Sequence, residues 1–299
     1  MTSKISNWKL YTLESEYRDY TKFEINKLTY YLPNNVNVNG KKNVFTVQFD
    51  PKEVVKKKFV EKLENSLKKF KIKKIFFRLN PIQTSKLHLS KAIKKLQNEK
   101  YIMSKINLIL LDLKKDNKEL RKNLRKSYKS LINKESKSLN ILFSNENKFR
   151  KKLFQDWVSI YSKAILRGNK ILSEKTYNIL EKAIYDEECL LSIAYDKKEP
   201  VGGMLFSLSK NFAIYESSAN IAKVESDRTR SVGHFLMWNS ILKLKEIGIN
   251  YFELGTYYDV IPNTIYLKNW IKKETGITNF KKGFGAEIIS SYYFAKENI

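Results

Sequence analysis

The sequence has few of the residues that build disulfide-rich, metal-binding or fibrous proteins. Its 299 residues include 1 cysteine, 2 histidines, 10 glycines and 5 prolines. A lone cysteine cannot form an internal disulfide, and so few Cys and His side chains do not make a zinc site. Glycine and proline are too scarce for a fibrous or disordered chain. The composition predicts a folded protein without a metal, in which Cys189, within an apolar strand pattern, is a core residue.

Long apolar runs are absent too. No stretch approaches the roughly 20 uncharged apolar residues that cross a bilayer, and residues 1–10 lack the apolar core of a signal peptide. We therefore expect a cytoplasmic protein with no transmembrane segment.

Acidic residues are few beside basic ones. The chain has 31 Asp and Glu against 57 Lys and Arg, a formal net charge of +26. Such charge attracts nucleic acid, nucleotide-linked or lipid-linked substrates, or an anionic membrane surface. Most of these cations are lysine, which an AT-rich coding sequence also produces, whereas arginine recognises phosphate better. Charge alone leaves a functional and a compositional explanation open.

The order of predicted elements indicates an α/β chain with one or two cores. The first third alternates strands and helices: strands 28–32, 43–49 and 74–79, and helices 52–70 and 85–97. Later come a strand 106–113, helices 117–137, 146–166 and 173–184, strands 189–195, 201–208 and 212–217, a helix 232–247, a strand 251–254, a helix 264–274 and two closing strands.

The later elements resemble the second half of a GNAT fold. That half has three antiparallel strands, a loop, a helix, a parallel strand, a helix and a terminal pair of strands. We expect an α/β (α+β) fold with a GNAT-like mixed sheet flanked by helices. Two GNAT-like lobes are expected, a degenerate one at 1–145 and a catalytic one at 146–299.

The predicted helix 117–137 carries a cationic face. Arg121, Arg125 and Lys129 line one side of it, and Leu120, Leu124 and Tyr128 begin an apolar side. Two interpretations stay open: a solvated face of an ordinary amphipathic helix, or a stripe that contacts phosphate.

The last segment carries the most specific resemblance. It reads Gly-Ile-Thr-Asn-Phe-Lys-Lys-Gly-Phe-Gly at 276–285, after Phe-Glu-Leu-Gly at 252–255 and a helix containing Trp238. Gly-Gly-Met-Leu at 202–205 and Ile-Tyr-Glu-Ser-Ser-Ala at 214–219 fit two central strands of the same pattern. Over residues 105–290 the chain resembles the FemAB-like aminoacyl and acyl transferases.

This resemblance implies transfer of an acyl or aminoacyl group to an amine of a cell-envelope precursor, of peptidoglycan or of a surface polysaccharide. The donor would be an activated acyl compound, an aminoacyl-tRNA or an acyl-CoA, and no cofactor would stay bound. The acceptor would be a phosphorylated envelope precursor, with possible peripheral contact to an anionic membrane. Lys281 would stabilise the oxyanion of the tetrahedral intermediate, and Phe280 would shape the donor pocket.

The resemblance also implies residues for the acceptor and for proton removal. Arg167 and Tyr215 match positions that hold the phosphorylated sugar-peptide. Glu253, at the end of the parallel strand, is a candidate general base. Asp259, in the following loop, is a second candidate base and is also expected to bind the substrate.

The loop before helix 232–247 is the expected donor site. In GNAT enzymes this loop and the helix N-terminus bind the pyrophosphate of acyl-CoA. Arg230, Ser231 and Gly233 keep part of that pattern, but Phe235 is bulky where the pattern has a small residue. A CoA-dependent N-acyltransferase acting on an amino sugar and a non-catalytic RNA-binding protein on a GNAT scaffold are the alternative functions.

Overall fold

The computed structural model describes residues 20–25, 28–33, 37–38, 41–42, 44–49, 51–69, 74–79, 86–166, 174–209, 211–221, 231–257 and 268–297. The chain divides into two compact units. Unit 1 comprises Met1–Asn107 and Ile289–Ile299, and unit 2 comprises Leu108–Ile288. The boundary expected after residue 145 lies within unit 2, so the units do not divide there. That the N-terminal lobe is a degenerate GNAT copy stays a prediction.

Unit 1 is built from a hairpin and a strand group covered by helices. Its elements are β1 (Tyr20–Ile25), β2 (Leu28–Pro33), β3 (Asn37–Val38), β4 (Lys41–Lys42), β5 (Val44–Phe49), α1 (Pro51–Val54), α2 (Phe59–Lys69), β6 (Lys74–Leu79) and α3 (Lys86–Asn98). Strand β6 pairs in parallel with β5 and antiparallel with the last strand, β13 (Glu287–Glu297). The described apolar side chains of α2, among them Phe59, Leu63 and Leu67, are buried at helical spacing.

The single helix expected at 52–70 is two helices. Lys58 adopts a φ of 58°, which lies in the left-handed region and interrupts an α-helix between α1 and α2. Pro51 begins α1, as expected of a residue whose missing N–H is not needed in the first turn.

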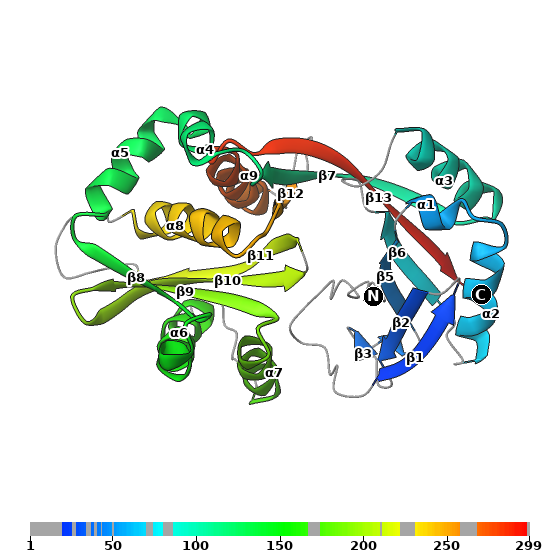
Figure 1. Cartoon of the computed structure of the whole chain (residues 1–299), viewed down its shortest axis with the longest axis horizontal. Coiled ribbons are helices and arrows are strands. Elements are labelled where there is room, and N and C mark those ends of the chain that lie inside the picture. Colours follow the sequence, from blue (N-terminus) through cyan, green and yellow to red (C-terminus); the bar gives the residue numbers. More distant parts are fainter. Residues whose placement is uncertain are drawn as a thin grey trace. The chain divides into compact units, whose positions relative to one another are not determined.

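Unit 2 contains the remaining elements. They are β7 (Ile102–Asp112, which begins in unit 1), α4 (Asn117–Asn123), α5 (Lys126–Glu135), β8 (Leu139–Phe143), η1 (Asn147–Phe149), α6 (Arg150–Leu166), α7 (Glu174–Tyr185), β9 (Cys189–Asp196), β10 (Glu199–Ser209), β11 (Phe212–Asn220), α8 (Val232–Glu246), β12 (Tyr251–Tyr257) and α9 (Lys268–Lys282). Within this unit the strand order is β7-β12-β11-β10-β9-β8. Helix α8 covers one face of β9–β11, and α6 and α7 cover the other (Figure 1).

Most of the expected strands and helices of unit 2 are confirmed, but the helix 117–137 is not continuous. Leu124 and Arg125 have extended ψ angles of 141° and 137°, so α4 ends and α5 begins anew. The apolar pattern runs through the break because Leu120, Leu124, Tyr128 and Ile132 all reach the same core. A tertiary contact described below accounts for the break.

The end of the chain also differs from the expectation. The helix expected at 264–274 extends to Lys282, and among the described residues one strand, β13, follows it instead of two. Phe280 and Lys281 therefore lie in the last turn of a helix, not in a strand.

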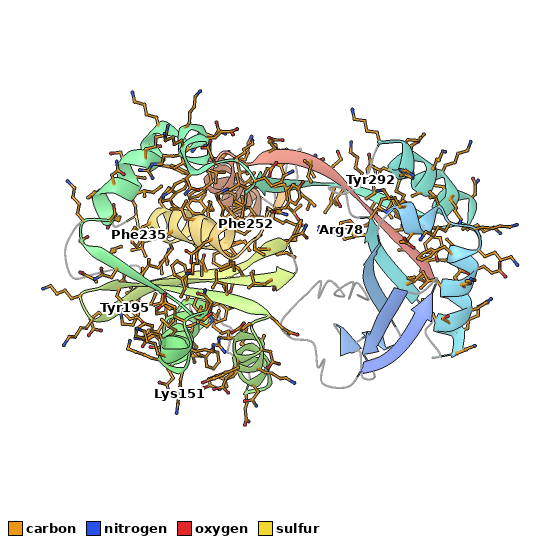
Figure 2. All side chains as sticks on the ribbon, in the orientation of Figure 1. Arg78, Lys151, Tyr195, Phe235, Phe252 and Tyr292 are labelled. Atoms are coloured by element: carbon orange, nitrogen blue, oxygen red, sulfur yellow. The ribbon has the colours of Figure 1, made fainter. Side chains whose placement is uncertain are left out.

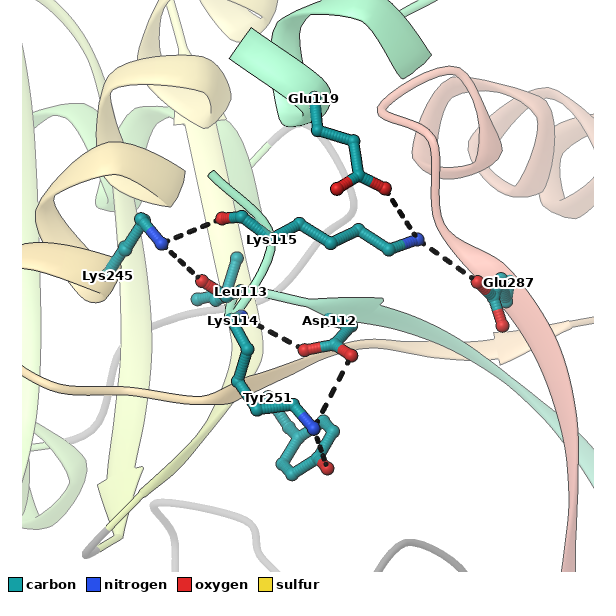
Figure 3. Close-up of polar contacts among 8 residues, drawn as sticks. All are labelled: Asp112, Leu113, Lys114, Lys115, Glu119, Lys245, Tyr251 and Glu287. Carbon is teal, nitrogen blue, oxygen red and sulfur yellow. Dashed lines mark hydrogen bonds and ion pairs between the residues drawn. The ribbon is translucent and has the colours of Figure 1, made fainter. Parts of the chain in front are cut away.

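A polar cluster fixes the start of α4 relative to α8 (Figure 3). The Lys245 ammonium at the end of α8 donates to the carbonyls of Leu113, at 2.8 Å, and Lys115, at 2.7 Å. Lys115 itself lies 3.3 Å from a carboxylate oxygen of Glu287. The Asp116 side chain accepts from the Glu119 N–H at 2.8 Å and caps α4. None of the helices within the described ranges has the length and apolarity to span a membrane.

Candidate active site

Strands β11 and β12 separate in the middle of unit 2. Their parallel register runs from Phe212 opposite Tyr251 to Ile214 opposite Glu253 and ends there. Strand β11 continues to Asn220, and β12 continues to Tyr257. The two strands therefore part just before Tyr215 and just after Glu253.

Lys281 lies at this point of separation. Its side chain is half-buried, and its Nζ is 5.2 Å from the centre of the Tyr215 ring. Gly255 of β12, with a φ of +108°, lies so close that a methyl group on it would be 2.8 Å from the same Nζ. An ammonium thus lies beside both diverging strands, on an aromatic face that favours a cation.

Phe280 belongs to an aromatic cluster with Tyr128, His234 and Phe284. Its ring centre is 5.0 Å from that of His234 and 5.2 Å from that of Phe284. The Tyr128 ring lies 4.3 Å from His234, edge to face. The Tyr128 hydroxyl donates to the carbonyl of Phe280 at 3.1 Å. Residues from α5, α8 and α9 therefore hold the helix end that carries Lys281.

The glycine after this helix end is required by close packing. A methyl group at Gly283 would lie 2.2 Å from Cε2 of Tyr128. The carbonyl of Gly283 accepts from the backbone N–H of Arg125 at 2.9 Å. Because that N–H bonds across the fold, it does not bond within a helix, which explains the break between α4 and α5.

Two carboxylates lie near the same strand separation. Glu253 is 5% exposed. Glu216, which sequence reasoning did not single out, occupies a β-bulge, because Leu205 pairs with Ser217 but Phe206 pairs with Tyr215. The Ser207 hydroxyl donates to the Glu216 carboxylate. Burial raises the pKa of Glu216, the nearby Glu253 carboxylate adds to the rise, and the Ser207 hydrogen bond opposes it.

Tyr215 turns a polar group toward the end of β11. Its hydroxyl donates to the Ser218 Oγ at 2.6 Å. Burial raises the pKa of Tyr215, with the Ser218 hydrogen bond acting in the opposite direction. The phenol is therefore neutral at physiological pH and can both donate and accept hydrogen bonds.

The expected donor loop meets a carboxylate of the chain itself. The backbone N–H of Ser231, the N-cap of α8, donates to Glu135 Oε1 at 3.1 Å, and Glu135 is 2% exposed. A methyl group at Gly233 would be 3.8 Å from the Phe280 ring. Phe235 is buried in the core. One orphan N–H of this helix is thus satisfied internally.

His234, in the first turn of α8, is neutral within the aromatic cluster. Burial lowers its pKa, and the Arg125 guanidinium lowers it further. It therefore packs as an uncharged ring between Tyr128 and Phe280.

The structure brings together Lys281, Tyr215 and Glu253 at the strand separation, and Phe280 with Gly233 beside α8. The remaining predicted residues, Arg167, Asp259 and Arg230, lie outside the described residues. Glu216 and Glu135 were missed, although Glu216 stands within the strand motif 214–219. Within the described ranges, no three His, Cys, Asp or Glu side chains are grouped to hold a metal ion.

Comparison with known proteins finds similarity in structure only. No protein-family model matches the sequence, and no curated protein sequence matches it. FemX shares 12% identity with a TM-score of 0.59, covering 92% of this chain and 83% of that one. L-PGS from Bacillus licheniformis shares 11% identity with a TM-score of 0.56, covering 87% of this chain and 79% of that one.

A third solved structure agrees. The C-terminal domain of a putative lysylphosphatidylglycerol synthetase from Agrobacterium fabrum shares 12% identity with a TM-score of 0.50, covering 85% of this chain and 78% of that one. The α/β fold predicted from the order of elements is confirmed, and it is similar to the folds of FemX and L-PGS.

Proposed function

We propose that this protein transfers an aminoacyl or other acyl group to an amine of a cell-envelope precursor. The observation that carries the proposal is the position of Lys281, whose Nζ lies beside the Tyr215 ring and Gly255 where β11 and β12 part. When an amine attacks an ester or thioester carbonyl, negative charge develops on the carbonyl oxygen. A half-buried ammonium stabilises that charge more than water does, because the local dielectric constant is lower.

The attacking amine must also lose a proton. Glu253 was the sequence-based candidate base, and Glu216 now joins it, since its raised pKa makes it a better proton acceptor near neutral pH. Tyr215 would orient the acceptor through its hydroxyl, and Phe280 would form one wall for the donor. Arg167 and Asp259 remain predicted contacts of the acceptor.

The similarity in fold supports an envelope acceptor. One structural neighbour is a domain of a putative lysylphosphatidylglycerol synthetase, which is named for a phospholipid that carries a lysyl group. The FemAB-like motif at 276–285 implies the same class of acyl transfer. An activated donor of either predicted kind, aminoacyl-tRNA or acyl-CoA, fits this chemistry, but Glu135 at the N-terminus of α8 weighs against CoA held in the usual GNAT manner.

The experiment incubates the purified chain with aminoacyl-tRNAs carrying radiolabelled amino acids and with candidate acceptors, namely amino sugars, peptidoglycan precursors and phospholipids. Lys281→Ala should lower the rate by about 10²- to 10³-fold, as loss of one oxyanion donor does. Lys282→Ala is the matched control, because its Nζ lies over the Tyr257 ring at 5.1 Å instead. Transfer at the wild-type rate by Lys281→Ala would refute the catalytic assignment.

A further inference from the structure

Residues 121–137, from α4 to the turn after α5, carry a set of positive charges that form no ion pair with a described carboxylate. We define the α4–α5 cation surface by seven residues: Arg121, Lys122, Arg125, Lys126, Lys129, Lys134 and Lys137. Residues 120–137 contain one acid, Glu135, which is buried and accepts from Ser231. Among the described residues, none of the seven cations makes an ion pair. Five of the seven residues are exposed, and Arg121 and Lys129 are half-buried.

The cations that have contacts bind neutral groups. Arg121 lies 5.2 Å from the Trp238 ring, and the Lys129 ammonium donates to the carbonyl of Lys122 at 2.9 Å. Such contacts orient the side chains and leave their charge available for an anionic ligand.

The surface borders the proposed catalytic centre. Arg125 donates its backbone N–H to the Gly283 carbonyl at 2.9 Å, and its guanidinium lies 3.4 Å from the carbonyl of Asn279. Asn279 precedes Phe280 and Lys281 in the last turn of α9. A ligand with a charged backbone on α4 and α5 could thus bring a reactive end to Lys281.

The exposed face of these helices is polar, which favours RNA over a lipid bilayer. Helices that lie in a membrane interface place apolar side chains in the acyl region. Here Leu120, Leu124, Tyr128 and Ile132 are buried in the protein core, and Leu131 is half-buried. A row of cations without exposed apolar anchors suits a sugar-phosphate backbone.

We infer that the α4–α5 cation surface binds the backbone of an RNA-linked acyl donor. The inference rests on the proposed function for the transfer step. It also gives the donor phosphates a place other than α8, where the Ser231 N–H already has Glu135 as its partner. The repeated charges of the α4–α5 cation surface match a polymer of phosphates better than a single pyrophosphate.

The test measures binding of end-labelled, deacylated bacterial transfer RNA by fluorescence anisotropy at several salt concentrations. The variant Lys122→Gln/Lys126→Gln/Lys134→Gln removes three exposed charges from the surface. The control Lys148→Gln/Lys151→Gln/Lys163→Gln removes three exposed charges elsewhere in unit 2. Figure 2 shows Lys151 on α6, across the strands from α4 and α5.

The surface variant should bind RNA at least about 10-fold more weakly at 100 mM salt, and the salt slope should fall by about 1 for each lysine that contacts a phosphate. The control should bind like the wild type. Equal losses in both variants, or wild-type binding by the surface variant, would overturn the inference. Binding to phosphatidylglycerol vesicles is measured in the same way. A surface variant that loses its binding to these vesicles but keeps its binding to transfer RNA would also overturn the inference.

Lys281→Ala separates this inference from the proposed function. It should bind transfer RNA like the wild type while losing acyl transfer. If Lys281→Ala keeps transfer, the catalytic proposal fails while the surface stands. If transfer depends on Lys281 but RNA binding does not depend on α4–α5, the surface fails alone.

Discussion

The backbone N–H of Ser231 donates a hydrogen bond of 3.1 Å to a carboxylate oxygen of Glu135, 96 residues earlier in the chain. This end of α8 is where the sequence pattern predicted donor phosphate. A phosphate placed there would lie close to the Glu135 carboxylate, whose negative charge repels it. The helix dipole is instead complemented from within the protein.

Replacing Glu135 should lower the stability of the folded protein. Glu135→Ala should lower the free energy of unfolding by about 1–3 kcal/mol, because the Ser231 N–H loses its partner in a partly buried position. Glu135→Gln keeps an acceptor oxygen and should cost less. Urea denaturation measures both.

In the wild type, CoA should leave the melting temperature unchanged, because Glu135 already occupies the N–H at the start of α8. Stabilisation by about 2.7 kcal/mol at 100 times its Kd would contradict this prediction.

Gly283 should tolerate no side chain. Gly283→Ala places a methyl group 2.2 Å from a Tyr128 ring atom, and such overpacking should destabilise by about 1–3 kcal/mol. Gly276→Ala is the control, since nothing lies within 4 Å of a methyl group at that exposed position of α9. It should stabilise by about 0.5–1 kcal/mol through helix propensity. The midpoints of urea denaturation measure both effects. If neither variant changes the midpoint, the Tyr128 ring can move to make room for the methyl group, and the prediction is wrong.

Gly255 should matter for catalysis as well as for stability. Gly255→Ala combines a φ of +108° with a methyl group 2.8 Å from Lys281 Nζ. Gly248→Ala shares the positive φ, +88°, but meets nothing within 4 Å. Both should lose about 1–2 kcal/mol from backbone strain. Only Gly255→Ala should also slow acyl transfer, because it displaces the ammonium, and equal transfer rates in the two variants would argue against that.

His234 should make stability depend on pH. Its pKa is lowered in the folded protein, by burial first and by Arg125 second, so the unfolded chain binds the proton more readily. The contribution is fully present above the unfolded pKa of about 6.5 and declines as the pH falls toward the folded pKa. The free energy of unfolding should thus fall between pH 7.5 and pH 5.5. In His234→Phe the fall should be smaller, and an identical fall would assign it to other groups.

The sequence predicted the fold where local pattern and motif agree. The strands β9 to β12 and helix α8 follow from apolar runs and the turn between Asp196 and Glu199. The motif at 276–285 correctly indicated a fold similar to that of FemX. Its secondary structure was predicted wrongly, because the helix was expected to end at residue 274, whereas α9 continues through the exposed Gly276 to Lys282.

The features that sequence reasoning missed depend on contacts between distant residues. The break after Leu124 arises from the bond of Arg125 to the Gly283 carbonyl, and an intact apolar pattern hides it. The pairing of Glu135 with Ser231 has no local signal, since the sequence around a glutamate at the end of a basic helix predicts an exposed side chain. Glu216 became visible only through the bulge opposite Phe206.

The division of the chain into units bears on its synthesis. Unit 2 is one uninterrupted stretch, Leu108–Ile288, so its internal contacts can all form once residue 288 has left the ribosome. Unit 1 must wait, because β6 finds its antiparallel neighbour only when Tyr292–Glu297 emerges. Unit 2, which bears Lys281, can therefore fold first, while unit 1 cannot complete its strand pairing until β13 has been synthesised.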